Sequence, residues 1–217
     1  MKISLHRALS QIKTTAARLE DLFYNDNLQL VDIADVNGKT SDKTQEADVI
    51  AMIQGSHDKF NSMYSNLFKL KSALAQANAG AIGEVERFEI CGSKYTIAEL
   101  IILKSMLHYE KDFIDHARRQ LAKAKRQLDE RDKDLKRRID SHVAAMSGGD
   151  KKNNSDEVKQ FIEFFTKNNE WHMIDPLKLE KMIEEKDAEY AKLVVEIDSA
   201  LDERNALTLI DVDLTDC

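Results

Sequence analysis

The sequence has few residues that interrupt helices and few that fill a thick apolar core. Its 217 residues include one proline and seven glycines, and 6% of them are aromatic whereas 33% are charged. Long helices can therefore continue without a break, while a sheet with two covered faces would lack the apolar residues to cover it. This composition predicts long helices that pack over narrow seams.

Cysteines and long apolar runs are also scarce. Cys91 and Cys217 match no ligand spacing, which argues against a disulfide scaffold or a zinc site and favours reduced thiols inside a cell. The longest apolar run, Leu100 to Leu103, is too short to span a membrane, and the N-terminal residues show no signal peptide. We therefore expect a cytoplasmic or virion-associated protein. The formal net charge of −7 argues against general affinity for nucleic acid.

The segment from Thr96 to Asp140 contains neither glycine nor proline. Thr96 followed by Glu99 is the pattern of a capping box, and it predicts a helix that continues to about Met146. Such a helix would be roughly 75 Å long at 1.5 Å per residue. Apolar side chains recur along it at a spacing of seven, which predicts a seam for another helix. They are Leu100, Leu107, Ile114, Leu121, Leu128 and Leu135.

Charge suggests which helix lies on this leucine stripe. Residues 116–140 contain ten Lys or Arg against five Asp or Glu, a net of +5, whereas residues 180–204 contain nine acidic against four basic residues, a net of −5. Opposite charges beside apolar stripes select helix partners. We therefore expect the acidic last helix, of the same chain or of a second copy, to lie along the basic segment.

Other helices are predicted from caps and periodicity. The first begins after the N-cap Ser4 and ends near Tyr24, and the second covers about 43–79. An amphipathic segment covers 156–171, and Pro176 is expected in the first turn of a last helix that ends near residue 207.

Short extended segments separate these helices. Leu28, Leu30 and Ile33 precede an Asn-Gly turn signal and indicate a strand or extended arm, while Phe88 and Ile90 precede a predicted hairpin turn at Gly92-Ser93. The tail 207–212 is a further candidate strand. The expected fold is thus mainly α: an elongated helical bundle or coiled-coil hairpin with one or two short β-hairpin or strand segments. Its predicted parts are a bundle (1–146), a flexible linker (147–155) and a last part (156–217) that packs back on the bundle.

Four segments, in this order, resemble a known family. They are SLHRAL at 4–9, KLKSALAQANAG at 69–80, YTIAEL at 95–100 and PLKLEKMIEEKDAEYAKL at 176–193. Together they look like the septicolysin-like family of small helical proteins from bacteria and their phages. The resemblance implies a helical fold, and the family's name implies a cytolysin. The basic extension through Arg138 and the insert 148–171 have no counterpart in the family pattern.

Two motifs could carry chemistry. NGKT at residues 37–40 resembles the end of a phosphate-binding loop, but Ile33 occupies the position of the first required glycine, so a surface turn is favoured. His108, Asp112 and His116 share one helix face and could offer ligands to a metal. A solvated face is the preferred interpretation on so charged a helix, and we expect no metal or cofactor.

Two further groups could bind a partner. The basic run 118–127 could contact phosphates through Lys123, Lys125 and Arg126, but it lacks aromatic residues to stack on bases, so pairing with another helix is favoured. Aromatic residues cluster in 161–171, where packing under the bundle is favoured over a hook that docks on a partner or membrane. The cluster comprises Phe161, Phe164, Phe165 and Trp171.

The sequence therefore predicts a non-enzymatic structural or adaptor protein that self-associates through its long helices as a phage or bacterial assembly component. The expected partner is another copy or another protein, and no small-molecule substrate is indicated. A membrane-active cytolysin-like protein and a nucleic-acid-associated helical protein are the alternatives. The leucine stripe from Leu107 to Leu135 and the aromatic cluster are the candidate interaction residues.

Overall fold

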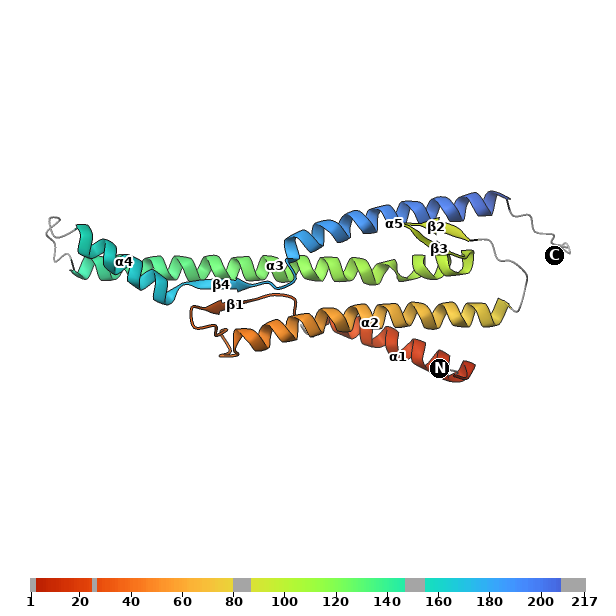
Figure 1. Ribbon diagram of the computed structural model, residues 1–217, viewed down its shortest axis with the longest axis horizontal. Coiled ribbons are helices and arrows are strands. Elements are labelled where there is room, and N and C mark those ends of the chain that lie inside the picture. The colour runs from red at the N-terminus through yellow and green to blue at the C-terminus, as the bar shows by residue number, and fades with distance from the viewer. Residues whose placement is uncertain (1–2, 25–26, 80–86, 147–154, 208–217) are drawn as a thin grey trace, which may run out of the picture. The chain divides into compact units, whose positions relative to one another are not determined.

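A computed structural model describes residues 3–24, 27–79, 87–146 and 155–207 of the chain. Within these ranges the fold is mainly helical, as the sequence predicted. Its helices, shown in Figure 1, are α1 (Leu5–Phe23), α2 (Glu46–Ala79), α3 (Ile97–Met146), α4 (Ser155–Asn169) and α5 (Leu179–Leu207). The predicted linker 147–155, except for Ser155, and the predicted tail strand, except for Leu207, lie outside the described residues.

Two small antiparallel sheets accompany the helices. β1 (Asp32–Asp35) pairs with β4 (Trp171–Ile174), and β2 (Phe88–Ile90) pairs with β3 (Ser93–Tyr95). In the first sheet Asp32 lies opposite Ile174 and Asp35 opposite Trp171. The predicted short strand segments are therefore present, and one sheet joins stretches that are far apart in the sequence.

The chain forms two compact units, each assembled from separate stretches. Unit 1 contains Met1–Tyr24, Asn61–Ile114 and Glu184–Cys217, and unit 2 contains Asn25–Phe60 and Asp115–Ile183. Helix α3 contributes residues 97–114 to unit 1 and residues 115–146 to unit 2. The leucine stripe is divided in the same way, with three members in each unit.

The helix starts of unit 1 agree with the predicted caps. The Ser4 hydroxyl accepts a hydrogen bond from the backbone N–H of Arg7 at 3.3 Å. At the start of α3 the backbone N–H of Thr96 donates to the Glu99 carboxylate at 2.8 Å, and the Glu99 N–H donates to the Thr96 hydroxyl at 3.2 Å. This reciprocal pair is the predicted capping box, and it supplies acceptors for backbone donors that the helix itself leaves unbonded.

The core of unit 1 lies where α3 packs against α5. Ile90, Leu100, Leu103, Leu107, Ile197 and Ala200 form one buried cluster. Ion pairs at 2.7 Å between Lys104 and Asp198 and at 3.4 Å between Glu110 and Lys186 show that the two helices run antiparallel here. The last helix therefore folds back on α3 in the same chain, side by side with it in Figure 1.

The β2–β3 hairpin turns one residue earlier than predicted. Ile90 pairs with Ser93, so the two-residue loop is Cys91-Gly92, and both residues have positive φ angles of 49° and 77°. Such a loop matches the right-handed twist of the two strands, and glycine adopts the second conformation without steric cost. The expected Gly92-Ser93 turn was wrong by one position because Cys91, a residue with no turn preference, takes the first place.

The extended segment of unit 2 also differs from the prediction. Strand β1 begins at Asp32, so Leu28 and Leu30 precede it, and both are completely buried. The strand's partner is β4, which follows β1 by more than 130 residues, rather than a neighbouring hairpin strand. Ala34 and Ile174 from this sheet pack with Val49 and Ile53 of α2 in a small core cluster. Local alternation therefore located an extended segment but could not locate its partner.

Pro176 does not lie in the first turn of the last helix. The helix begins at Leu179, whose backbone N–H donates to the Asp175 carboxylate at 2.9 and 3.0 Å. Lys178, immediately before it, has a positive φ of 53°, which is incompatible with a helical residue. Pro176 occupies the turn between the capping carboxylate and the helix, so the prediction placed the start of α5 about one turn too early.

Candidate functional site

The leucine stripe is largely covered within the chain. Leu100, Leu107 and Ile114 in unit 1 are 0%, 7% and 3% exposed. In unit 2, Leu121 and Leu135 are each 8% exposed, and Leu128 is half-buried. These candidate interaction residues therefore pack against other segments of the same chain.

The expected charge pairing holds at one point and fails farther along the helix. Lys125 contacts Glu180 at 2.8 Å, so the first turn of α5 does reach the basic segment. From there α5 continues along the apolar first part of α3, where its contacts include Glu110 and Lys104. The acidic helix was thus expected too far toward the C-terminal end of α3, because net charge over a window does not determine register.

Aromatic side chains lie against the basic end of α3 in unit 2. The Arg131 guanidinium lies 4.4 Å from the centre of the Trp171 ring, and that of Arg138 lies 5.1 Å from the Phe165 ring. His142 stacks near both Phe161 and Phe165, with ring centres 5.8 and 5.3 Å away. Three of the four predicted aromatic residues thus pack on α3, which is the arrangement that the sequence favoured.

Phe164 and Trp171 depart from the predicted amphipathic segment. Phe164 points away from these contacts and is 69% exposed. Trp171 belongs to β4 rather than to the helix, because α4 ends at Asn169. Phe164 is therefore the member of the cluster that remains available to a partner.

The three-residue metal candidate is not a solvated face. His108 and Asp112 are exposed, but His116 is 3% exposed, and its Nε2 lies 2.8 Å from the carbonyl oxygen of Leu28. The solvated face was the wrong interpretation for His116, because the extended segment before β1 covers it. Among the described residues, no group of three or more His, Cys, Asp or Glu is arranged to hold a metal ion.

Gln120 joins His116 in holding the extended segment on α3. Its side-chain oxygen accepts a hydrogen bond from the Leu30 N–H at 2.7 Å, and its side-chain nitrogen donates to the Leu28 carbonyl. The His116 Nε2 lies 2.8 Å from both the Leu28 oxygen and the Gln120 side-chain nitrogen, so the three polar groups meet at one point. The Gln120 side-chain amide thus forms the two hydrogen bonds with this extended segment that the backbone of a neighbouring strand would form. Sequence reasoning missed Gln120, since nothing in its surroundings distinguishes it from other polar residues on α3.

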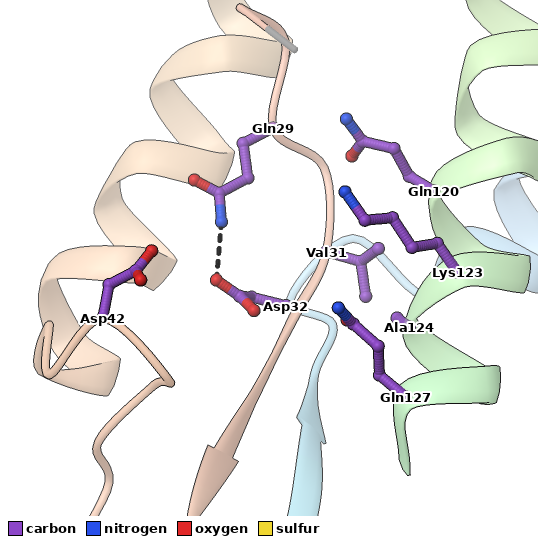
Figure 2. A pocket seen from close by; sticks show the side chains of 8 residues that line it. All are labelled: Gln29, Val31, Asp32, Asp42, Gln120, Lys123, Ala124 and Gln127. Carbon is purple, nitrogen blue, oxygen red and sulfur yellow. Dashed lines mark hydrogen bonds between the residues drawn. The ribbon is translucent and has the colours of Figure 1, made fainter. Parts of the chain in front are cut away.

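A polar groove opens beside this contact, and Figure 2 shows it from close by. It has a volume of about 280 Å³ and lies between the segment that precedes α2 and one face of α3. The first wall consists of Gln29, Val31, Asp32 and Asp42, and the α3 wall of Gln120, Lys123, Ala124 and Gln127. Carboxylates thus occupy one wall, while amides and an ammonium group occupy the other.

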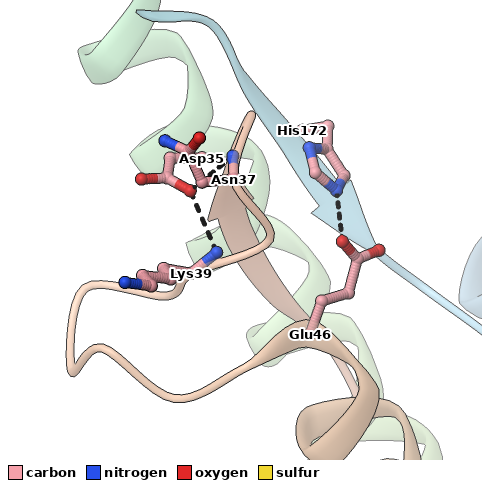
Figure 3. Close-up of polar contacts among 5 residues, drawn as sticks. All are labelled: Asp35, Asn37, Lys39, Glu46 and His172. Carbon is pink, nitrogen blue, oxygen red and sulfur yellow. Dashed lines mark hydrogen bonds and ion pairs between the residues drawn. The ribbon is translucent and has the colours of Figure 1, made fainter.

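The NGKT segment forms a surface turn, as predicted. Figure 3 shows the Asp35 carboxylate accepting hydrogen bonds from the backbone N–H groups of Asn37 and Lys39, each at 2.9 Å. The bond from Lys39 is the main reason that the pKa of Asp35 lies below its usual value. Gly38 has a φ of +69°, which glycine adopts without strain. Glu46, the first residue of α2, connects this loop to β4: its backbone N–H donates to the Gly38 carbonyl at 2.7 Å, and its carboxylate lies 3.1 Å from the His172 ring nitrogen.

Cys91 is exposed, as its place in the hairpin turn requires. Its backbone N–H donates to the Glu196 carboxylate at 2.8 Å and lowers the pKa of Glu196, while desolvation and the bond to that carboxylate raise the pKa of the Cys91 thiol. A thiol with a raised pKa stays protonated at neutral pH and is a poor nucleophile. Cys91 therefore attaches the hairpin to α5.

An apolar face is left open at the start of α1. Leu5 and Leu9 are 54% and 53% exposed, although Leu19 and Leu22 farther along the same helix are 0% and 3% exposed. The sequence showed the periodicity that joins Leu5 to Leu19, but it gave no sign that the two ends of the helix would differ in burial. Among the described residues, no helix combines the length and apolar character needed to cross a bilayer.

Comparisons with known proteins add no relative: no protein-family model, no curated protein and no solved structure matches this chain.

Proposed function

We propose that this chain is a non-enzymatic helical structural or adaptor protein that self-associates through the first half of α1. The observation that carries the proposal is the exposure of Leu5 and Leu9 on the face of α1 that is buried at Leu19. A cytoplasmic or virion-associated location, and a role in phage or bacterial assembly, belong to the same proposal.

The geometry of α1 supports a helix as the partner. Leu5, Leu9, Ile12, Ala16 and Leu19 follow one another at alternating spacings of four and three, so they lie on one face of the helix. Leu19 is fully buried, Ile12 and Ala16 are half-buried, and Leu5 and Leu9 are exposed. One end of a continuous apolar face is thus covered within the chain, and the other end is open.

A second copy is the partner that fits best. The open strip is narrow and has helical spacing, so the same strip of another copy is complementary to it, and a two-fold axis would let each copy both offer and receive it. The long helices predicted to mediate this association have their stripe largely covered within the chain. The association is therefore assigned to α1 instead.

The test is the mass of the full chain in solution over a range of protein concentrations. We expect a dimer, and we expect a monomer when Leu5→Glu and Leu9→Glu are combined, because charges would replace the apolar contact. Thr14→Glu is the control, since Thr14 is exposed and lies on the opposite face of α1. A wild-type chain that stays monomeric, or a double variant that dimerises as well as the control, would contradict the proposal.

Membrane binding is the second candidate, and α1 provides a specific observation in its favour. The first acidic residue of the helix is Glu20, whereas Arg7, Lys13 and Arg18 precede it. A basic amphipathic helix with an exposed apolar face is typical of proteins that lie on anionic membranes. Co-sedimentation with anionic vesicles, and dye leakage from them, would be lost in the Leu5/Leu9 double variant if this candidate is correct.

Nucleic-acid association has weaker support. Lys125 already contacts Glu180, and Arg118 contacts Asp115 at 3.0 Å, so part of the basic run is neutralised within the chain. If the chain does bind nucleic acid, we expect the affinity to decrease steeply with salt concentration and to depend on Lys123 and Arg126.

A further inference from the structure

We propose that the outer edge of β4 in unit 2 binds an extended peptide with an apolar–basic–apolar sequence, which adds a third strand to the β1–β4 sheet. The sheet consists of β1 and β4, and no third strand pairs with either of them in the part of the chain that the structure describes. Strand addition of this kind obtains affinity from backbone hydrogen bonds and specificity from alternate side chains. The surface is separate from the open strip on α1, so the proposal names a partner without depending on self-association.

The hydrogen bonds of β1 show which backbone groups of β4 point outward. The N–H of Ile33 donates to the carboxylate of the residue before it at 2.8 Å, and the N–H of Asp35 donates to the Lys39 carbonyl at 2.9 Å. Directly opposed residues of an antiparallel pair exchange both of their hydrogen bonds or neither. The partners of these two residues, Met173 and Trp171, therefore direct their N–H and C=O groups away from β1.

The two edges of the sheet differ in whether these outward groups are bonded. At the β1 edge, the turn uses Asp35 fully, because its N–H donates to Lys39 and its C=O accepts from the Gly38 N–H at 2.9 Å. At the β4 edge, the outward N–H and C=O groups of Trp171 and Met173 form no hydrogen bond with any residue that the structure describes. An open row of donors and acceptors is a template for another strand. The available edge is therefore that of β4.

The side chains of β4 define what the added strand must carry. Trp171 and Met173 are half-buried on the face toward α3, where the Arg131 guanidinium lies over the indole ring. His172 lies on the opposite face, where its ring nitrogen is 3.1 Å from the carboxylate of Glu46 (Figure 3). A strand paired with β4 places two side chains beside Trp171 and Met173 and the one between them beside His172. The outer two positions thus favour apolar residues.

The central position of the peptide favours a basic residue. The Glu46 side chain is 35% exposed and can accept a further hydrogen bond beside His172. Acidic residues also border the strand, with Glu170 before it and Asp175 after it. A lysine or arginine between the two apolar residues therefore lies among carboxylates, whereas a glutamate in that place is repelled by them.

The experiment is calorimetric titration of the full chain with the peptide acetyl-Gly-Thr-Val-Lys-Val-Thr-Gly-amide. We expect saturable binding. Methylation of both valine nitrogens removes the donors that meet the carbonyls of Trp171 and Met173 and keeps every side chain, so it should weaken binding at least about tenfold. A peptide with glutamate in place of lysine should bind at least about threefold more weakly, because a like charge then lies beside Glu46.

Variants of the protein assign the binding to the β4 edge. Met173→Pro removes an outward N–H and leaves the hydrogen bonds to β1 in place, since proline is tolerated where the N–H does not face a partner strand. It should weaken binding at least about tenfold. Met173→Ala is the control, because it shortens the same side chain but keeps the N–H, and it should weaken binding less. The fluorescence of Trp171 checks that the sheet persists in both variants.

A second pair of variants tests the charge preference. Glu46→Gln should remove the preference for the lysine peptide over the glutamate peptide, whereas Glu163→Gln, the same change at an exposed position of α4, should retain it. The Leu5→Glu and Leu9→Glu double variant should bind the lysine peptide as the wild type does, so this proposal and that for α1 fail separately.

The proposal is overturned if the lysine peptide does not bind, if the methylated peptide binds equally well, or if Met173→Pro binds as the wild type does. It is also overturned if Met173→Pro lowers self-association while no peptide binds, because the edge then belongs to a second copy of the chain.

Discussion

The two parts of α3 are packed in different ways, although one apolar stripe runs through both. Residues 97–114 belong to unit 1, where Leu100, Leu103 and Leu107 pack with aliphatic residues of α5. Residues 115–146 belong to unit 2, where hydrogen bonds to an extended segment and cation–π contacts to α4 and β4 accompany the leucines. The first part is held by a long neighbouring helix and the second by short segments.

The residues beside the stripe explain this difference. Three positions after each stripe residue lie Leu103, Glu110, Ala117, Ala124, Arg131 and Arg138, so the apolar seam narrows toward the C-terminal end. A seam with two apolar residues per heptad can bury a neighbouring helix, whereas a single row of leucines cannot. Arginine stems and planar guanidinium groups lie on Trp171 and Phe165 there instead. A uniform seven-residue repeat therefore does not imply a uniform partner.

Replacement of matched leucines should show the largest difference between the two parts. Leu100→Ala removes a fully buried side chain from the α3–α5 cluster and should lower the free energy of unfolding by about 2–5 kcal/mol. Leu128→Ala, the same change at a half-buried position of the same stripe, should cost less than about 1.5 kcal/mol. Denaturant unfolding measures both values, and equal losses would show that the two parts are packed alike.

Removal of the Gln120 amide should have an intermediate effect that is confined to unit 2. Gln120→Ala leaves the Leu30 N–H without its acceptor, which should cost about 1–3 kcal/mol. Hydrogen exchange at Leu30 should accelerate, while exchange at Leu103 in unit 1 should not. Gln127→Ala is the control because Gln127 is exposed one heptad farther along the helix. An unchanged rate of hydrogen exchange at Leu30 would contradict the proposed role of Gln120 in holding the extended segment on α3.

The smallest effect is expected where a cation lies over the indole ring. Arg131→Met keeps an aliphatic stem on Trp171 but removes the charge, and it should cost about 0.5–1 kcal/mol. Since Trp171 is the only tryptophan in the sequence, its fluorescence reports the change directly. Arg126→Met should alter neither fluorescence nor stability, and an emission shift of equal size in both variants would contradict the contact.

Local sequence patterns predicted where helices and strands lie better than they predicted which segments pack against each other. The Ser4 cap and the Thr96–Glu99 capping box agree with the structure because these features depend on residues close in the sequence. The partner of β1, the burial of His116 and the role of Gln120 depend on residues 88 or more positions away. No local pattern contains that information.

The sequence by itself determined that this protein consists of long helices, that an uninterrupted helix bears a seven-residue stripe, and that its apolar seam narrows toward the basic end. Each of these properties follows from propensity, capping and periodicity, which act over a few residues. The tertiary structure alone decided which part of α3 receives α5, that an extended segment before β1 covers His116, and that α1 is buried at one end and open at the other. Those outcomes depend on which distant surfaces bury the most apolar area together while satisfying their polar groups, and that competition involves the whole chain at once.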